Sequence, residues 1–225
     1  MHVLDAIASR YSCRSFLPTP VPEKTVREIV ERAARAPSAG NIQPWRVDVL
    51  AGERLEALKA VMRPRMSELP KGEGTEYPIY PDDLQPPYSD RRFAVGEMLY
   101  RSINVAREDK PARYRQYARN FEFFGAPVGL FVSIERSFVL AQWVDLGSFI
   151  QNFMLLARDF GLHTCPQEAW ASFSRTVSAF LGLPAGTMLF CGIALGHADE
   201  QAAINSWRAT RVPLRDFATF SGFAD

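Results

Sequence analysis

The sequence has few cysteines and no long apolar run. Its three cysteines, Cys13, Cys165 and Cys191, are odd in number and widely separated, which is typical of reduced thiols rather than of a disulfide framework. No apolar stretch approaches the roughly 18 residues that a membrane-spanning helix needs. The N-terminal residues also lack the basic, apolar and small-residue order of a signal peptide. We therefore expect a cytoplasmic protein with no membrane partner.

Several motifs for cofactors and catalysis are missing as well. No Gly-x-Gly-x-x-Gly follows an expected strand, and no Gly-x-x-x-x-Gly-Lys occurs, which argues against a resident dinucleotide and a P-loop. His2, His163 and His197 are far apart, so we expect no metal site. Hydrolysis is disfavoured because no Gly-x-Ser-x-Gly occurs. Lys and Arg number 26 against 25 Asp and Glu, so the net charge of +1 gives no reason to expect a nucleic-acid partner.

What is present predicts a globular α+β fold. The chain has 225 residues, of which 47% are apolar, enough for one domain over residues 1–225 with a sizeable core. Apolar periodicity predicts helices over 23–35, 53–62, 91–107, 112–124 and 140–162, and strands over 46–52, 126–135 and 188–196. Helices that flank a few strands in mixed order favour an α+β fold with one sheet.

Two segments lack this periodicity. Residues 63–88 are rich in Pro, Gly and Tyr, which favours a functional lid over a plain surface loop, and we place the lid region at 63–124. The tail over 205–225 has aromatic residues without helical spacing. An arm of this kind would expose its rings in water, so we expect it to wrap a partner chain.

Two basic clusters suggest a phosphate site. In "RYSCRSF", Arg10, Ser12 and Arg14 offer two planar guanidiniums and a hydroxyl, and Arg208 and Arg211 form a second cluster in the tail. Such donors grip a phosphate through several charge-assisted hydrogen bonds. The alternative is that these arginines are solvated or paired with carboxylates. Cys13 lies among the cations, but a bystander thiol is the favoured interpretation.

Four motifs in order resemble the flavin-dependent nitroreductase family: "RYSCRSF", "APSAGNIQPWRV", "GLHTCPQEAW" and "RATRVPL". Further segments resemble its nitrobenzoate and nitroaromatic reductase branch. The resemblance implies a mostly antiparallel central sheet flanked by helices, in an intertwined homodimer that holds FMN at its interfaces. It also implies a ping-pong cycle in which NADH or NADPH supplies electrons and a small nitroaromatic, quinone or enone acceptor receives them.

The resemblance also assigns roles to residues. Arg10, Ser12, Arg14 and Arg211 would hold the FMN phosphate and ribityl chain, with Tyr11 and Arg208 ranked lower. Tyr11 stands where many relatives carry a second basic residue. The second subunit would reach across to the flavin with Pro37, Ser38, Asn41 and Gln43. The face of the flavin ring would be lined by Pro166, Gln167 and Glu168. The acceptor would lie among Tyr88, Phe121 and Phe124, and no catalytic side chain is expected.

Other interpretations stay open. The same flavin fold also suits reductive dehalogenation or oxidation of a ring substrate. A phosphate-ligand binding module without redox chemistry is a further alternative. Without the family pattern, "PSAGNIQPW" also suits a turn that ends a helix, and "CPQEAW" an ordinary loop.

Overall fold

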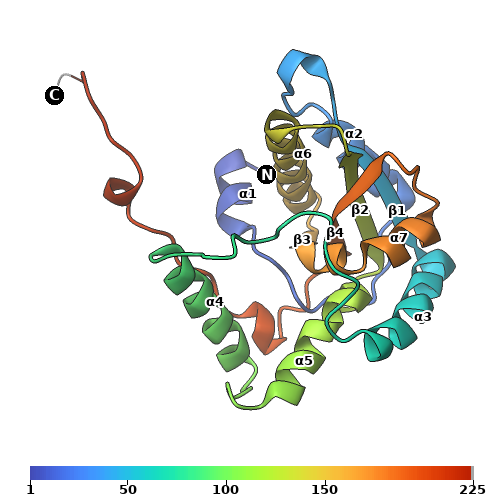
Figure 1. The fold of residues 1–225 in the computed structure, drawn as a ribbon. Coiled ribbons are helices and arrows are strands. Elements are labelled where there is room, and N and C mark those ends of the chain that lie inside the picture. Colours follow the sequence, from blue (N-terminus) through green and yellow to red (C-terminus); the bar gives the residue numbers. More distant parts are fainter. Residues whose placement is uncertain (224–225) are drawn as a thin grey trace.

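The sheet has four strands and is antiparallel throughout. In the computed structural model, which describes residues 1–223, the strand order is β1-β2-β4-β3 (Figure 1). The strands are β1 (Arg46–Ala51), β2 (Val128–Glu135), β3 (His163–Gln167) and β4 (Thr187–Gly196). Each neighbouring pair is antiparallel, and the central strands β2 and β4 are buried along nearly their whole length. The predicted α+β class and antiparallel sheet are confirmed.

Strand β3 was not predicted. Its sequence, "HTCPQ", is short, has little apolar alternation and contains Pro166, which cannot donate a ladder hydrogen bond. The structure accommodates this proline because β3 lies at the edge of the sheet, paired only with β4. Pairing with β4 fixes these residues in register, from His163 opposite Gly196 to Gln167 opposite Gly192.

Helices α2 (Glu23–Ala33) and α6 (Leu140–Asp159) cover one face of the sheet. Ile29 of α2 and Phe153 of α6 are fully buried there, against the even-numbered side chains of β2. Helix α1 (Val3–Ser9) contacts α6 but buries only Ala6. The periodic stripes of the sequence thus face the sheet as expected.

The other face carries α3 (Gly52–Glu68), α7 (Ser174–Leu181) and the 3-10 segments η2 (Arg119–Gly125) and η3 (Glu168–Ser172). Trp170 of η3 is fully buried at the centre of this layer, with the rings of Phe121, Phe123 and Phe131 around it. Gly192 of β4 makes this packing possible, since a Cβ there would lie 2.3 Å from Cδ1 of Trp170. A small residue is therefore required beneath the indole.

The start of the expected lid region is attached to the body. Helix α3 continues past Pro64 to Glu68, whereas the prediction ended it at residue 62. The Glu73 carboxylate then accepts hydrogen bonds from Thr176 Oγ1 at 2.6 Å and from Arg65 Nη2 at 2.8 Å. Tyr77 donates to Phe190 O at 2.6 Å. These contacts fix the segment before residue 78 to α7 and β4.

Helices α4 (Tyr88–Ser102) and α5 (Lys110–Ala118) contain no buried residue, and Figure 1 shows α4 at the side of the molecule. Helix α4 begins and ends earlier than the predicted 91–107, and α5 begins and ends earlier than the predicted 112–124. After α5 the chain enters η2, where Phe123 and Phe124 adopt left-handed φ angles of 49° and 55°. Burial of their rings holds this unfavourable backbone conformation in place.

The tail contains η4 (Ala203–Asn205) and η5 (Leu214–Asp216) and then runs away from the body (Figure 1). Phe217, Phe220 and Phe223 are 68%, 64% and 80% exposed, as expected for an arm without an intrachain partner. The last two positions of the expected arm lie outside the described residues. Within residues 1–223, no helix has the length and apolar character needed to cross a bilayer.

Candidate functional site: a cavity between the two ends of the chain

The first half of the site is an extended strand-like segment beside β3. Helix α1 ends at Ser9, Arg10 is already extended, and Ser12 forms a parallel bridge with Thr164 of β3. Cys13 N donates to Thr164 O at 3.0 Å, and the Cys13 side chain is fully buried. Because successive side chains in extended backbone point in opposite directions, this places Arg14 on the side of Ser12.

Asn205 attaches the second half, and sequence reasoning missed it. Its Oδ1 accepts from Arg14 N at 2.8 Å, while its Nδ2 donates to Ser15 O at 2.8 Å and to Asp199 O at 2.9 Å. This buried amide therefore joins the start of the tail to the N-terminal segment. Arg208 follows three residues later, so it is carried to the same place as Arg14.

The two ends together enclose a cavity of about 430 Å³. It is lined by Ile7, Ala8, Arg10, Tyr11, Ser12, Arg14, Val95, Gln151, Ile204, Trp207, Arg208, Ala209 and Arg211. The structure thus brings together every residue of the two predicted basic clusters. We refer to Arg10, Arg14, Arg208 and Arg211 as the arginine cluster.

The arginine cluster has no acidic counterpart. No Asp or Glu lines the cavity, and none of the four guanidiniums is ion-paired with a carboxylate in residues 1–223. Burial, and then the positive charge of Arg211, lower the pKa of Arg10. An anion with several acceptor oxygens would relieve this repulsion and would satisfy the free N–H groups.

Strand β3 leads from this cavity to a second group of predicted residues. Pro166, Gln167 and Glu168 stand at its C-terminal end. Gln167 is held by Asn120 of η2, because its Nε2 donates to Asn120 O at 2.8 Å and to Asn120 Oδ1 at 3.2 Å. The buried Oε1 of Gln167 has no partner within the described residues. Burial raises the pKa of Glu168.

The third predicted group is a turn that does not reach this cavity. Pro37, Ser38, Asn41 and Gln43 follow α2, around the short segment η1 (Ala39–Asn41). Ser38 Oγ accepts from Gln43 N at 3.0 Å, which closes the turn. Asn41 and Gln43 are exposed.

The aromatic residues predicted around an acceptor divide into two classes. Tyr88 begins α4 and is 61% exposed, with the Arg91 guanidinium 5.4 Å from its ring centroid. Phe121 and Phe124 are only 1% and 2% exposed, because both pack into the layer around Trp170. Both rings are therefore much less accessible than that of Tyr88, although Phe121 also lines a hollow of about 320 Å³ beside α3 and α5. Contact of an acceptor with either ring stays a prediction.

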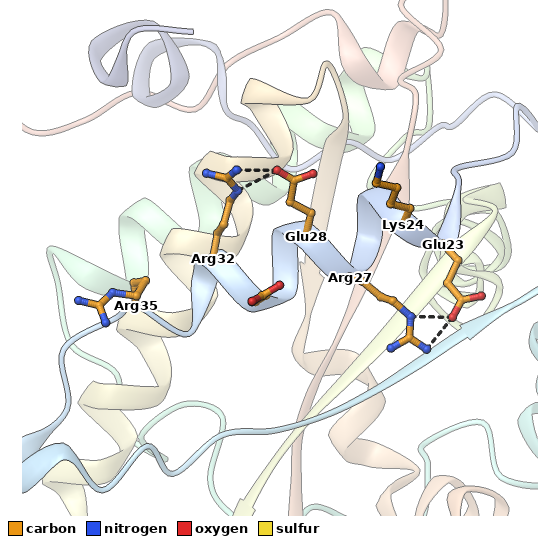
Figure 2. Close-up of a pocket in the computed structure, with 7 residues that line it drawn as sticks. Glu23, Lys24, Arg27, Glu28, Arg32 and Arg35 are labelled. Atoms are coloured by element: carbon orange, nitrogen blue, oxygen red, sulfur yellow. Dashed lines mark hydrogen bonds and ion pairs between the residues drawn. The ribbon is translucent and has the colours of Figure 1, made fainter.

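Another large hollow lies along α2, but it lacks the uncompensated positive charge of the arginine cluster. Its lining residues all come from positions 23–35, on one helix and its end. Figure 2 shows that Arg27 pairs with Glu23 and Arg32 with Glu28, at one-turn spacing. The charges here are compensated within one exposed helix face, unlike those of the arginine cluster.

Comparisons with known proteins find similarity along most of the chain. The nitroreductase family model matches residues 7–197. A 4-nitrobenzoate reductase of Pseudomonas putida is 40% identical over 217 residues, which are 96% of this chain and 94% of that protein. The FMN- and NADPH-dependent nitroreductase NfnB of Sphigopyxis sp. strain HMH matches with a TM-score of 0.96 and 43% identity, over 99% of this chain and 100% of that one. The FMN-dependent NfnB of Mycobacterium smegmatis, solved with NADPH, has a TM-score of 0.93 and 29% identity, over 98% of each chain.

Proposed function

This chain belongs to the nitroreductase family, and from that premise we propose that it is an FMN-dependent oxidoreductase that uses NADH or NADPH to reduce nitroaromatic acceptors. One observation carries the proposal: the arginine cluster gathers guanidiniums from both ends of the chain in one cavity that no carboxylate lines. The similar proteins include a nitroreductase described as FMN- and NADPH-dependent and an FMN-dependent one solved with NADPH, which supports both the cofactor and the electron donor.

The donor set of the cavity fits a flavin mononucleotide. Arg10, Ser12, Arg14 and Arg211 would hold the phosphate and ribityl chain, with Arg208 beside them. The flavin ring would lie along the end of β3, at Pro166, Gln167 and Glu168. The exposed turn with Pro37, Ser38, Asn41 and Gln43 would contact the ring from a second copy of the chain.

When bound, FMN supplies the two-electron redox chemistry, and the protein supplies placement and electrostatics. The arginine cluster neutralises the phosphate and fixes its position. Strand β3 is held on β4 along its length, so the backbone at its end offers a rigid edge to a flat ring. Of the three aromatic residues predicted around the acceptor, Tyr88 has the most accessible ring for stacking on a flat nitroarene.

We also propose a homodimer. Val3, Leu4 and Ile7 of α1 and the three phenylalanines of the tail are exposed, which is unfavourable for an isolated chain. Strand β1 is a sheet edge, and an open groove of about 710 Å³ lies between it and α2. An apolar arm from a second copy has the character needed to cover such an edge. Light scattering that gives the mass of a single chain would contradict this arrangement.

The first test is optical. The purified protein should be yellow, and NADH or NADPH should bleach it without air. Subsequent addition of 4-nitrobenzoate should restore the oxidised spectrum. A colourless protein that does not take up added FMN would refute the cofactor, and a flavin that no nitroarene reoxidises would refute the acceptor class.

The second test addresses the phosphate contacts. Arg14→Ala removes a charged hydrogen-bond donor that contributes about 1.5–3 kcal/mol, so the FMN dissociation constant should rise roughly 10- to 150-fold. The matched control is Arg35→Ala, since Arg35 is exposed and lies outside the cavity. Fluorescence titration of apoprotein with FMN measures both. Equal affinities in the two variants would refute the assignment.

A further inference from the structure

The ring of Tyr11 lies directly against one member of the arginine cluster. The guanidinium carbon of Arg208 is 3.7 Å from the centroid of the Tyr11 ring, a close cation–π contact. Tyr11 belongs to the N-terminal segment and Arg208 to the tail, so this contact crosses between the two ends of the chain. It is a second link between them, beside Asn205.

Arg208 is otherwise held on one side only. Its Nη1 donates to Asn205 O and to Trp207 O, both at 2.8 Å. These bonds occupy one nitrogen of the guanidinium and leave the donors of Nε and Nη2 for a ligand in the cavity. An arginine side chain has many rotamers, and one that is fixed before binding loses less entropy when it grips an anion.

The Tyr11 ring is itself supported from the core. Its centroid lies 5.3 Å from that of the His163 ring, at the start of β3. Arg158 of α6 donates to Leu162 O at 2.8 Å, and its Nη1 is 3.1 Å from His163 Nδ1. Because a guanidinium only donates, Nδ1 accepts and the imidazole is neutral. His163 therefore adds no positive charge behind Tyr11.

The contact between Tyr11 and Arg208 is made by the aromatic ring and is not an ion pair. Burial, and then the neighbouring Cys13 thiol, raise the pKa of Tyr11, so the side chain is neutral near pH 7 and forms no ion pair with Arg208. What it offers the guanidinium is its aromatic face. This differs from the role of a second basic residue, which would contact a phosphate by charge.

We propose that Tyr11 is a positioning residue whose ring holds Arg208 in the orientation that meets the phosphate of the cofactor. The inference rests on the proposed function, because it takes FMN as the ligand. In this role Tyr11 acts on the phosphate indirectly, through Arg208.

The test measures FMN and riboflavin dissociation constants for Tyr11→Phe, Tyr11→Leu, Arg208→Ala and the double variant Tyr11→Leu with Arg208→Ala. Tyr11→Phe keeps the ring and should bind FMN within about twofold of wild type, whereas Tyr11→Leu should weaken it roughly 2- to 30-fold, the range of a cation–π contact. Riboflavin, which has no phosphate, should be little affected. The double variant should bind FMN no more weakly than Arg208→Ala alone, because the two residues act as one unit.

The control is Tyr80→Leu, which breaks a similar contact, with the Arg92 guanidinium 4.1 Å from the Tyr80 ring, outside the cavity. It should leave FMN affinity unchanged. If Tyr11→Leu does not fold, Arg208→Lys tests the same contact, since it keeps the charge but loses the flat face, and it should also bind FMN more weakly.

Three results would overturn the inference: Tyr11→Phe as weak as Tyr11→Leu, additive effects of Tyr11 and Arg208, or wild-type FMN affinity in Arg208→Lys. Failure of the wild-type protein to bind FMN at all would instead refute the proposed function.

Discussion

Asn205 joins the two halves of the cavity, so its replacement by alanine should weaken both the fold and the cofactor site. Its side chain is 4% exposed and makes three hydrogen bonds of 2.8 to 2.9 Å, to Arg14 N, Ser15 O and Asp199 O. Asn205→Ala removes all three and leaves one N–H and two carbonyl groups without these partners. The carbonyls and the amide lie in a part-buried region, where such losses are not fully replaced by water.

The size of the effect follows from these bonds. A net contribution of about 0.5–1.5 kcal/mol for each gives a loss of roughly 1.5–4.5 kcal/mol in the free energy of unfolding. For a chain of this length, about 2–4 °C of Tm corresponds to each kcal/mol, so Tm should fall by at least about 3 °C. Asn205→Asp should be no better, because a carboxylate would face two carbonyl oxygens.

Circular dichroism during heating measures this fall. The apoprotein is compared at one fixed concentration, since ligand and subunit association both raise Tm. Asn152→Ala is the control, because it removes a single hydrogen bond of 3.5 Å. A Tm for Asn205→Ala equal to that of wild type, or a fall no larger than that of the control, would refute the reasoning.

Other predictions address the core, a histidine and the thiols. Gly192→Ala places a methyl group 2.3 Å from Trp170 Cδ1 and should lower the free energy of unfolding, measured in urea, by about 1–3 kcal/mol. Gly147→Ala, whose added Cβ has nothing within 4 Å, should cause no such loss, and equal stabilities of the two variants would contradict this prediction. Burial, and then the charge of Arg158, lower the pKa of His163 to about 4, while the unfolded chain protonates it near pH 6.5. Stability should therefore fall as pH drops from about 6.5 to 4, and His163→Gln should flatten that fall; an imidazole signal that titrates near pH 6.5 in NMR would argue against it. Burial raises the pKa of Cys13 to about 12 and that of Cys165 to about 11, and Cys191 is buried too. The three thiols should therefore react with Ellman's reagent far more slowly in the folded protein than after unfolding in urea.

The sequence predicted the layers of this fold well where packing is periodic. The stripe of α6 and the apolar runs of β2 and β4 face the core as their spacing requires. Strand β3 escaped notice because a short edge strand with a proline has no such period. The end of α5 was misplaced because the following aromatic residues look helical in sequence, but contacts with distant Trp170 set their backbone.

The site was predictable only in part, for a similar reason. The two basic clusters stand out by composition, and their resemblance to a known family suggested that they meet. Asn205 gave no signal, since one asparagine in the tail is unremarkable until its three partners are known. The burial of Phe121 and Phe124 likewise depends on residues far along the chain, so spacing alone could not separate these rings from exposed Tyr88.

The most direct measurement of the central claim compares FMN with riboflavin, which differs only by lacking the phosphate. If the arginine cluster binds that phosphate, the wild-type protein should bind FMN much more tightly than riboflavin. Arg14→Ala, at one end of the chain, and Arg211→Ala, at the other, should each reduce that ratio by roughly 10-fold or more. A ratio near one in the wild-type protein, or a ratio that neither variant changes, would contradict the account.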